Sequence, residues 1–128
     1  MRKTETALAL FTVGFLILYF PVETWASWGY GLWSPFYLVD LIAMILLGWG
    51  AIRSLHTRPQ TAPAILCAGY GWAGANAWRA LFGRLSEVRQ GGQLDHGGME
   101  LCAVAMGTAV MLACFALSLL LVVRSSER

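Results

Sequence analysis

Three polar residues interrupt long apolar stretches of this sequence, and their side chains are the first candidates for chemistry. They are Asp40, Asn76 and Arg79. An ionisable side chain at the centre of a membrane costs on the order of 3 kcal/mol, so such residues usually face protein or a water-filled cavity. Trp72, Asn76 and Arg79 are spaced i, i+4 and i+7, which places all three on one face of a helix. Together with Asp40 they predict a site that binds a proton, a small solute or a lipid headgroup.

The same residues also have a purely structural interpretation. Asp40 and Arg79 are expected at similar depth near one face of the membrane, on neighbouring helices. A neutralised ion pair of this kind can simply fix how two helices dock. The sequence leaves both interpretations open.

The composition of the chain places these residues in a membrane protein. Of its 128 residues, 58% are hydrophobic and only 12% are charged. A soluble domain of average composition carries about 25% charged residues, and a small body exposes proportionally more surface. A soluble enzyme domain and a disordered chain are therefore excluded. The formal net charge of +2 is too small and too dispersed to indicate a nucleic-acid partner.

Four apolar stretches are long enough, or nearly so, to cross a membrane, which takes roughly 20 residues as a helix. They are residues 7–22, 35–55, 62–82 and 101–123. The first is short and ends at Pro21, which a helix interior tolerates poorly. The third is the least hydrophobic. The pattern predicts an all-α membrane protein, with four antiparallel transmembrane helices in a compact bundle with short loops, forming a single domain over residues 1–128.

The first stretch has a rival interpretation. Met1-Arg2-Lys3 precedes the apolar run, and Thr24-Trp25-Ala26 follows it, which also fits a secretory signal with a small-residue cleavage site. The run is slightly long for that purpose, so we expect it to be retained as a spanning helix.

The distribution of Lys and Arg predicts the orientation. Four spans place both termini and the middle loop on one side, and that side holds most of the positive charge: Arg2, Lys3, Arg53, Arg58, Arg124 and Arg128. The other side holds Arg79, Arg84 and Arg89. Positive residues favour the cytoplasmic side, so we expect both termini in the cytoplasm and the protein in a bacterial inner membrane.

Several polar and aromatic residues are expected around the outer end of the bundle. The candidates for a polar vestibule there are Glu23, Trp33, His96 and Glu100. The alternative is that the aromatic residues are interfacial anchors, which Trp and Tyr commonly are in membrane proteins.

Small residues in the third and fourth stretches predict close helix packing. They are Gly69, Gly71, Gly74, Ala105, Gly107, Ala109 and Ala113. Small residues let the backbones of membrane helices approach closely. Such faces can pack within the bundle or against another chain.

Cysteines and histidines give no indication of a cofactor. Cys67, Cys102 and Cys114 lie in apolar stretches without a Cys-x-x-Cys pair, and burial makes a thiol inert. His56 and His96 are expected in loops, which excludes a haem held by two histidines inside the bundle. We expect no metal site, no cofactor and no catalytic group.

These observations predict three functions. The first is a non-catalytic accessory or oligomer-forming subunit of a membrane complex, with membrane lipids, further copies of itself or other integral membrane proteins as partners. The alternative is a carrier or transporter that binds a small molecule or lipid through Asp40, Asn76 and Arg79. The third is a lipid-modifying enzyme with its acid at Asp40 or Glu100.

Overall fold

The computed structural model describes residues 2–30, 34–56, 61–92 and 98–127, and in these ranges helices joined by short turns are the only regular secondary structure. Its elements are helix α1 (Arg2–Ser27), a short 3-10 helix η1 (Trp28–Tyr30), and helices α2 (Pro35–Leu55), α3 (Ala62–Arg89) and α4 (Met99–Ser126). The all-helical fold with four long helices agrees with the prediction.

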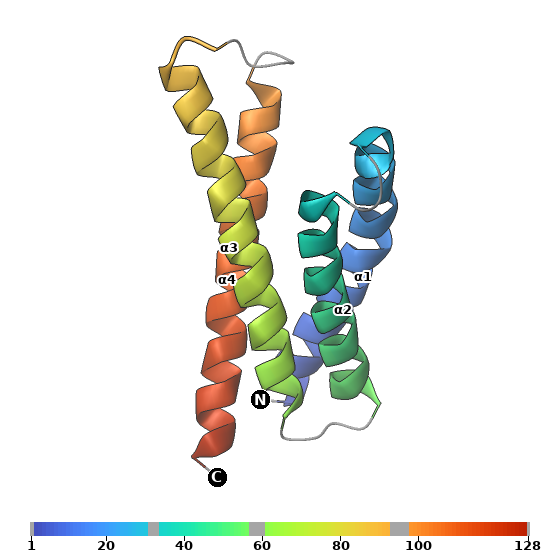
Figure 1. The fold of residues 1–128 in the computed structure, drawn as a ribbon. Helices are drawn as coiled ribbons and strands as arrows, with labels where there is room; N and C mark the ends of the chain where they lie inside the picture. Colours follow the sequence, from blue (N-terminus) through green and yellow to red (C-terminus); the bar gives the residue numbers. More distant parts are fainter. Residues whose placement is uncertain (1, 31–33, 57–60, 93–97, 128) are drawn as a thin grey trace.

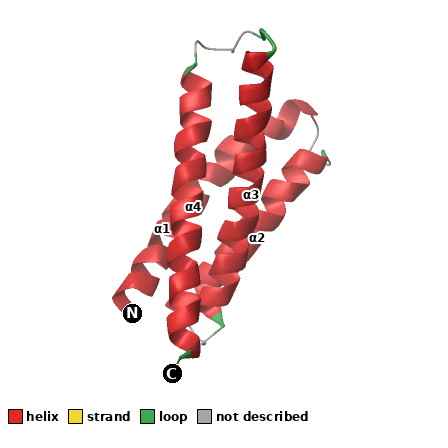
Figure 2. Ribbon diagram, turned by 90° about the vertical axis from the view of Figure 1, so that its left-hand side faces the viewer, coloured by secondary structure: helices red, strands yellow, loops and turns green. Residues whose placement is uncertain are grey.

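The helices lie in two neighbouring pairs (Figures 1 and 2). α1 packs against α2, and α3 packs against both α2 and α4. The N-terminal end of α1 and the C-terminal end of α4 lie at the same end of the molecule, which we call the terminal end. The opposite end, which carries η1, is the η1 end. There, α3 and α4 continue well beyond α1 and α2.

Three of the four helices are long and apolar enough to cross a membrane. The qualifying segments are Lys3–Trp25, Tyr37–Leu55 and Met99–Ser126. Many of their large apolar side chains face outward, as membrane-facing side chains do; Leu18 is 73% exposed and Ile45 is 57% exposed. These helices mark a membrane-associated protein.

Helix α3, which carries the third predicted span, is not among the three. Its 28 residues are long enough, but the segment is rich in Gly and Ala and contains Asn76, Arg79 and Arg84, which lower its hydropathy. α3 lies between α2 and α4, so it has two helical neighbours to cover its surface.

The first helix is longer than its sequence predicts. The sequence predicts a span over residues 7–22 that ends near Pro21, but α1 continues through Pro21 to Ser27. Proline removes a single backbone hydrogen bond, and such a loss is tolerated in membrane helices. Glu23 therefore belongs to the same helix as Tyr19 instead of a loop.

Close glycine contacts set the register between α2 and α3. A β-carbon added to Gly50 would lie 2.9 Å from the backbone nitrogen of Leu66, and one added to Gly69 would lie 2.9 Å from Leu47 Cδ2. Higher residue numbers in α2 therefore lie opposite lower residue numbers in α3. Two helical turns further toward the η1 end, the same register brings Asp40 and Asn76 to one level.

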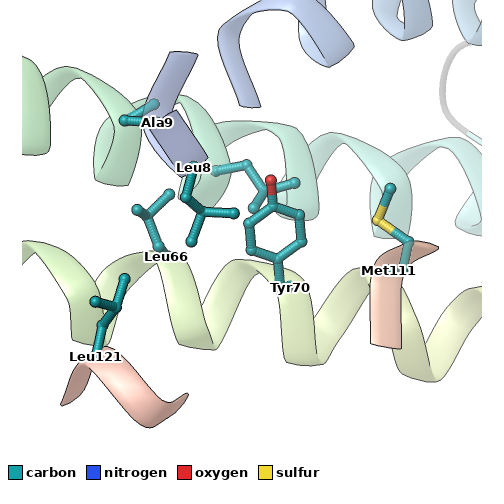
Figure 3. Close-up of a cluster of buried hydrophobic side chains, with 8 residues drawn as sticks. Leu8, Ala9, Leu66, Tyr70, Met111 and Leu121 are labelled. Atoms are coloured by element: carbon teal, nitrogen blue, oxygen red, sulfur yellow. The ribbon is translucent and has the colours of Figure 1, made fainter. Parts of the chain in front are cut away.

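The buried core lies toward the terminal end and draws on all four helices (Figure 3). It consists of Leu8, Ala9, Leu47, Ala51, Leu66, Tyr70, Met111 and Leu121. Tyr70 is fully buried, and its hydroxyl lies 2.6 Å from Thr12 Oγ1, which itself donates to the carbonyl of Leu8. Because that bond uses the only proton of Thr12, Tyr70 is the donor to Thr12.

Candidate functional site

Charged and polar side chains from three helices meet toward the η1 end. Asp40 of α2 lies close enough to Glu23 of α1 for a side-chain hydrogen bond, and it also lies within electrostatic range of Arg79 of α3. Tyr19 of α1 is close enough to Glu23 for a second side-chain hydrogen bond. We call Tyr19, Glu23, Asp40 and Arg79 the three-helix polar cluster.

Helix α1 supplies half of this cluster because of its residue spacing. Tyr19 and Glu23 are four residues apart, so they lie on one face of the helix, one turn above the other. The ring of Tyr19 stacks on that of Phe15, with 5.0 Å between ring centroids, which restrains it on the same face. The position of Glu23 depends on α1 continuing past Pro21.

The start of α2 fixes the position of Asp40 along the helix. Ser34 caps this helix by accepting a hydrogen bond from the backbone nitrogen of Tyr37, and Pro35 occupies its first turn. Asp40 therefore lies about 8 Å along the helix axis from Pro35. It lies inside the apolar segment Tyr37–Leu55 and is half-buried.

The predicted polar face of α3 borders the cluster. Trp72 donates from Nε1 to the carbonyl oxygen of Val39, over 3.0 Å, and so crosses from α3 to the residue beside Asp40. Asn76 lies at the level of Asp40, and its Nδ2 atom is buried without a hydrogen-bond partner among the described residues. Arg79, one turn further along, has an exposed side chain. Asn76 therefore leaves a donor available beside the cluster.

The structure distributes the predicted vestibule differently. Glu23 joins the cluster, whereas Glu100 at the start of α4 forms a salt bridge with Arg84 of α3. Trp33 and His96 lie outside the described residues.

No group of three His, Cys, Asp or Glu side chains able to hold a metal ion occurs within residues 2–30, 34–56, 61–92 and 98–127. The cluster itself offers two carboxyl groups and a phenol, next to a positively charged guanidinium. Its acceptors suit a hydrogen-bonding cation or a proton.

The small residues predicted to pack helices fall into two groups. Gly69, Gly71 and Gly74 are used inside the fold: they face Leu47, Phe115 and Leu112, respectively. Gly107 of α4 faces open space, with no atom within 4 Å of an added β-carbon, and Ala109 and Ala113 are exposed, while Ala105 is half-buried.

Sequence reasoning missed two groups of polar residues. It did not connect Tyr19 to Glu23, although their spacing of four was available, because it expected the helix to end before Glu23. It also missed the buried network in which Cys114 of α4 lies within hydrogen-bonding range of Tyr70, which donates to Thr12. Only the three-dimensional packing brings these last three residues together.

Comparison with known proteins supplies no further guide to the site. No protein-family model, no curated protein and no solved structure matches this chain. The chemistry of the cluster must therefore carry the functional argument.

Proposed function

We propose that this protein is a small integral membrane carrier that binds a polar small molecule or a lipid headgroup at the three-helix polar cluster. The observation that carries the proposal is the meeting of Glu23 and Asp40 inside apolar helices, within hydrogen-bonding range of each other. Two acidic groups so close repel each other when both are ionised, and desolvation adds to that cost. An arrangement this costly for stability is more typical of a binding site than of a packing contact.

The surroundings of the cluster support a ligand rather than a closed ion pair. A structural pair needs one acid and one base, whereas here two acids act with one arginine. Asp40 is only half-buried and Arg79 is exposed, so the cluster can be reached from outside the fold. Asn76 adds a buried donor with no partner in the described part of the chain.

The proposal includes a membrane topology. All four helices cross the membrane as an antiparallel bundle, with both termini on the cytoplasmic side of a bacterial inner membrane. α3 crosses despite its low hydropathy because α2 and α4 cover much of its surface. The support is the shared end of the two termini and the excess of Lys and Arg expected there. The cluster then lies in the outer leaflet.

Mass spectrometry of the purified protein tests the proposal. The wild-type chain is extracted from native membranes in mild detergent, and molecules bound to it without a covalent bond are identified. We expect one small molecule or lipid to accompany the wild type and to be lost from Asp40→Asn and Arg79→Gln. The variant Glu5→Gln, which changes a carboxylate elsewhere on α1, is the matched control and should retain it.

Two outcomes would contradict this function. One is a wild-type protein that carries no bound species. The other is a bound species that all variants retain equally. Full recovery by the charge exchange Asp40→Arg with Arg79→Asp would instead identify a structural pair.

A second candidate function is that of an accessory or self-associating subunit. The observation in its favour is the open space at Gly107, beside the exposed Ala109 and Ala113, on the surface of α4. Gly107→Leu should then reduce the size of the detergent-extracted particle without changing the stability of the monomer. An unchanged particle size would count against this candidate.

A further inference from the structure

We infer that a band of four aromatic side chains holds the η1 end of the protein at the headgroup boundary of a phospholipid bilayer. This aromatic band consists of Trp25, Trp28, Trp78 and Phe82. The residues beyond it, 83–89 of α3 and 99–102 of α4, form what we call the α3–α4 arm, and they stand in water. The inference concerns how the protein meets the membrane and does not depend on a ligand.

The side chains of the aromatic band all face outward. Trp25 is 85% exposed and Trp28 is 71% exposed, while Trp78 and Phe82 are 51% and 50% exposed. The rings of Trp78 and Phe82 lie together, with 4.8 Å between their centroids, so they form one surface. Tryptophan is enriched where a bilayer meets water because its ring is apolar while its N–H donates a hydrogen bond. Exposed side chains of this type therefore suit the headgroup boundary.

Contacts between the helices bring the members of the band to matching levels. Thr24 of α1 lies beside Tyr37 of α2, with 3.1 Å between their hydroxyl oxygens. The glycine contacts between α2 and α3 bring Tyr37 to the level of Arg79. Trp25 follows Thr24 and Trp78 precedes Arg79, so these two tryptophans lie at one level on different helices. The other two members of the band lie about one turn further toward the η1 end.

The distribution of the band over the molecule favours a bilayer as its occupant. Toward the η1 end, α2 lies between α1 and α3 (Figure 1), and the band is divided between α3 on one side and α1 with η1 on the other. A bilayer boundary is a plane that surrounds the molecule, so it meets α1 and α3 at one level on both sides of α2. The shared level of Trp25 and Trp78 is what such a boundary requires.

The α3–α4 arm carries charged side chains where the band ends. Arg84, Glu87 and Arg89 lie in the last two turns of α3, and Glu87 and Arg89 are exposed. Arg84 forms its salt bridge with Glu100 at the start of α4. Outward-facing charges are costly in the apolar interior of a bilayer. The arm, which extends beyond α1 and α2, therefore belongs in water (Figure 1).

The lengths of the spans agree with a boundary at the band. From Tyr37 to Arg53, α2 measures about 24 Å, which compares with about 30 Å for the hydrocarbon core of a bilayer. In α4, the glycine contacts with α3 place Gly107 at the level of the band, and Gly107 to Arg124 measures about 26 Å. A span from Met99 to Arg124 would measure about 38 Å. The first two turns of α4 are thus not needed to cross the membrane, although their composition would allow it.

Thiol labelling of two matched variants tests the position of the arm. Met99 in the arm is 74% exposed and Leu18 in α1 is 73% exposed, but Leu18 lies about 9 Å inside the level of Thr24. Full-length Met99→Cys and Leu18→Cys are placed in phosphatidylcholine nanodiscs and treated with a charged maleimide, and mass spectrometry locates the modified residue. Because the charged reagent does not enter lipid, we expect Met99→Cys to react at least about tenfold faster. In denaturing detergent the two should react at similar rates.

Fluorescence quenching tests the band itself. Wild type, Trp78→Phe and Trp25→Phe are placed in nanodiscs of phosphatidylcholine that is brominated either close to the headgroup or near the end of the acyl chain. The difference in emission between wild type and each variant belongs to the tryptophan that was replaced. We expect bromine close to the headgroup to quench both tryptophans more strongly than bromine near the chain end, and to the same extent for each.

Three outcomes would overturn the inference. Slow labelling of both cysteines in nanodiscs would mean that lipid covers the arm. Fast labelling of both would mean that α1 is not covered by lipid at Leu18. Stronger quenching by bromine near the chain end, or different depths for Trp25 and Trp78, would remove the band from the boundary. Neither experiment involves a ligand, so the proposed binding function keeps its own separate test.

Discussion

Polar groups lie at both ends of this helical protein, but they are of different kinds. Toward the terminal end, two buried neutral hydroxyls are satisfied within the protein: Thr12 donates to the carbonyl of Leu8 and Ser118 donates to that of Phe115. Toward the η1 end the polar groups are the charged groups of the three-helix polar cluster, with two acids against one base. The two hydroxyls are neutral and satisfied within the fold, whereas the cluster holds more acid than base.

This contrast separates stability from function along the length of the molecule. The terminal half also holds the shared core and the closest contacts between α2 and α3. We therefore expect changes there to affect folding, and changes in the cluster to affect binding.

The largest effect on stability is expected at Gly69. A β-carbon there would lie 2.9 Å from Leu47 Cδ2 and 3.0 Å from the backbone nitrogen of Leu47. Gly69→Ala should lower the free energy of unfolding by about 2 kcal/mol, because α2 and α3 must move apart. Denaturant titration in bicelles measures it. Gly14→Ala, where an added β-carbon meets nothing within 4 Å, is the matched control and should show no loss.

A smaller loss is expected at Tyr70. Tyr70→Phe removes the hydroxyl that donates to Thr12 while it keeps the buried ring. Hydrogen bonds between membrane helices contribute about 0.6 kcal/mol on average, so the free energy of unfolding should fall by roughly that amount. The same titration measures this loss, and ligand binding should not change. Loss of binding in Tyr70→Phe would contradict the division between the two ends.

The opposite result is expected at Asp40. Asp40→Asn relieves the repulsion between two neighbouring acids, so the free energy of unfolding should stay constant or rise by up to about 1 kcal/mol while binding is lost. Stability and binding are measured on the same preparation. A destabilisation greater than that of Tyr70→Phe would assign Asp40 a structural role.

The smallest effect is expected at the salt bridge between Arg84 and Glu100. Both side chains are 35% exposed, and ion pairs near the surface contribute between 0 and about 1 kcal/mol. Arg84→Gln should therefore change the free energy of unfolding by a few tenths of a kcal/mol, and this difference should shrink at high salt. A large loss that salt does not reduce would show that the pair is shielded from solvent.

The sequence predicted most of the helices because residues that begin or end a helix occur at the ends of the apolar runs. Ser34 and Pro35 begin α2, and a continuous apolar run follows to Leu55, so the predicted and observed bounds agree. Helix α1 differs because proline was treated as a terminator, although the loss of one hydrogen bond does not end a membrane helix. The hydropathy of α3 is lower than that of the other long helices because it is rich in glycine and alanine and contains asparagine. These residues suit contacts with neighbouring helices better than contacts with lipid.

Part of the cluster was also accessible from the sequence. Depth along the helices grouped Asp40 with Arg79. The spacing of four and seven residues placed Trp72, Asn76 and Arg79 on one face of α3. From this face Trp72 donates a hydrogen bond to Val39 of α2. The role of Tyr19 was hidden because the helix was expected to end before Glu23. The partner of Glu100 could not be predicted, because it depends on how far α3 and α4 extend beyond α2.

Pro21 has a consequence for the motions of the protein. Proline has no backbone N–H, so the carbonyl of Ile17 lacks its usual donor within α1, and the turn between Tyr19 and Glu23 is held less firmly than its neighbours. Bending at this turn moves Glu23 while Tyr19 stays stacked on Phe15. Amide hydrogens just after Pro21 should accordingly exchange with deuterium faster than those near Thr12. The separation of the two acids is thus adjustable by a bend in a single helix.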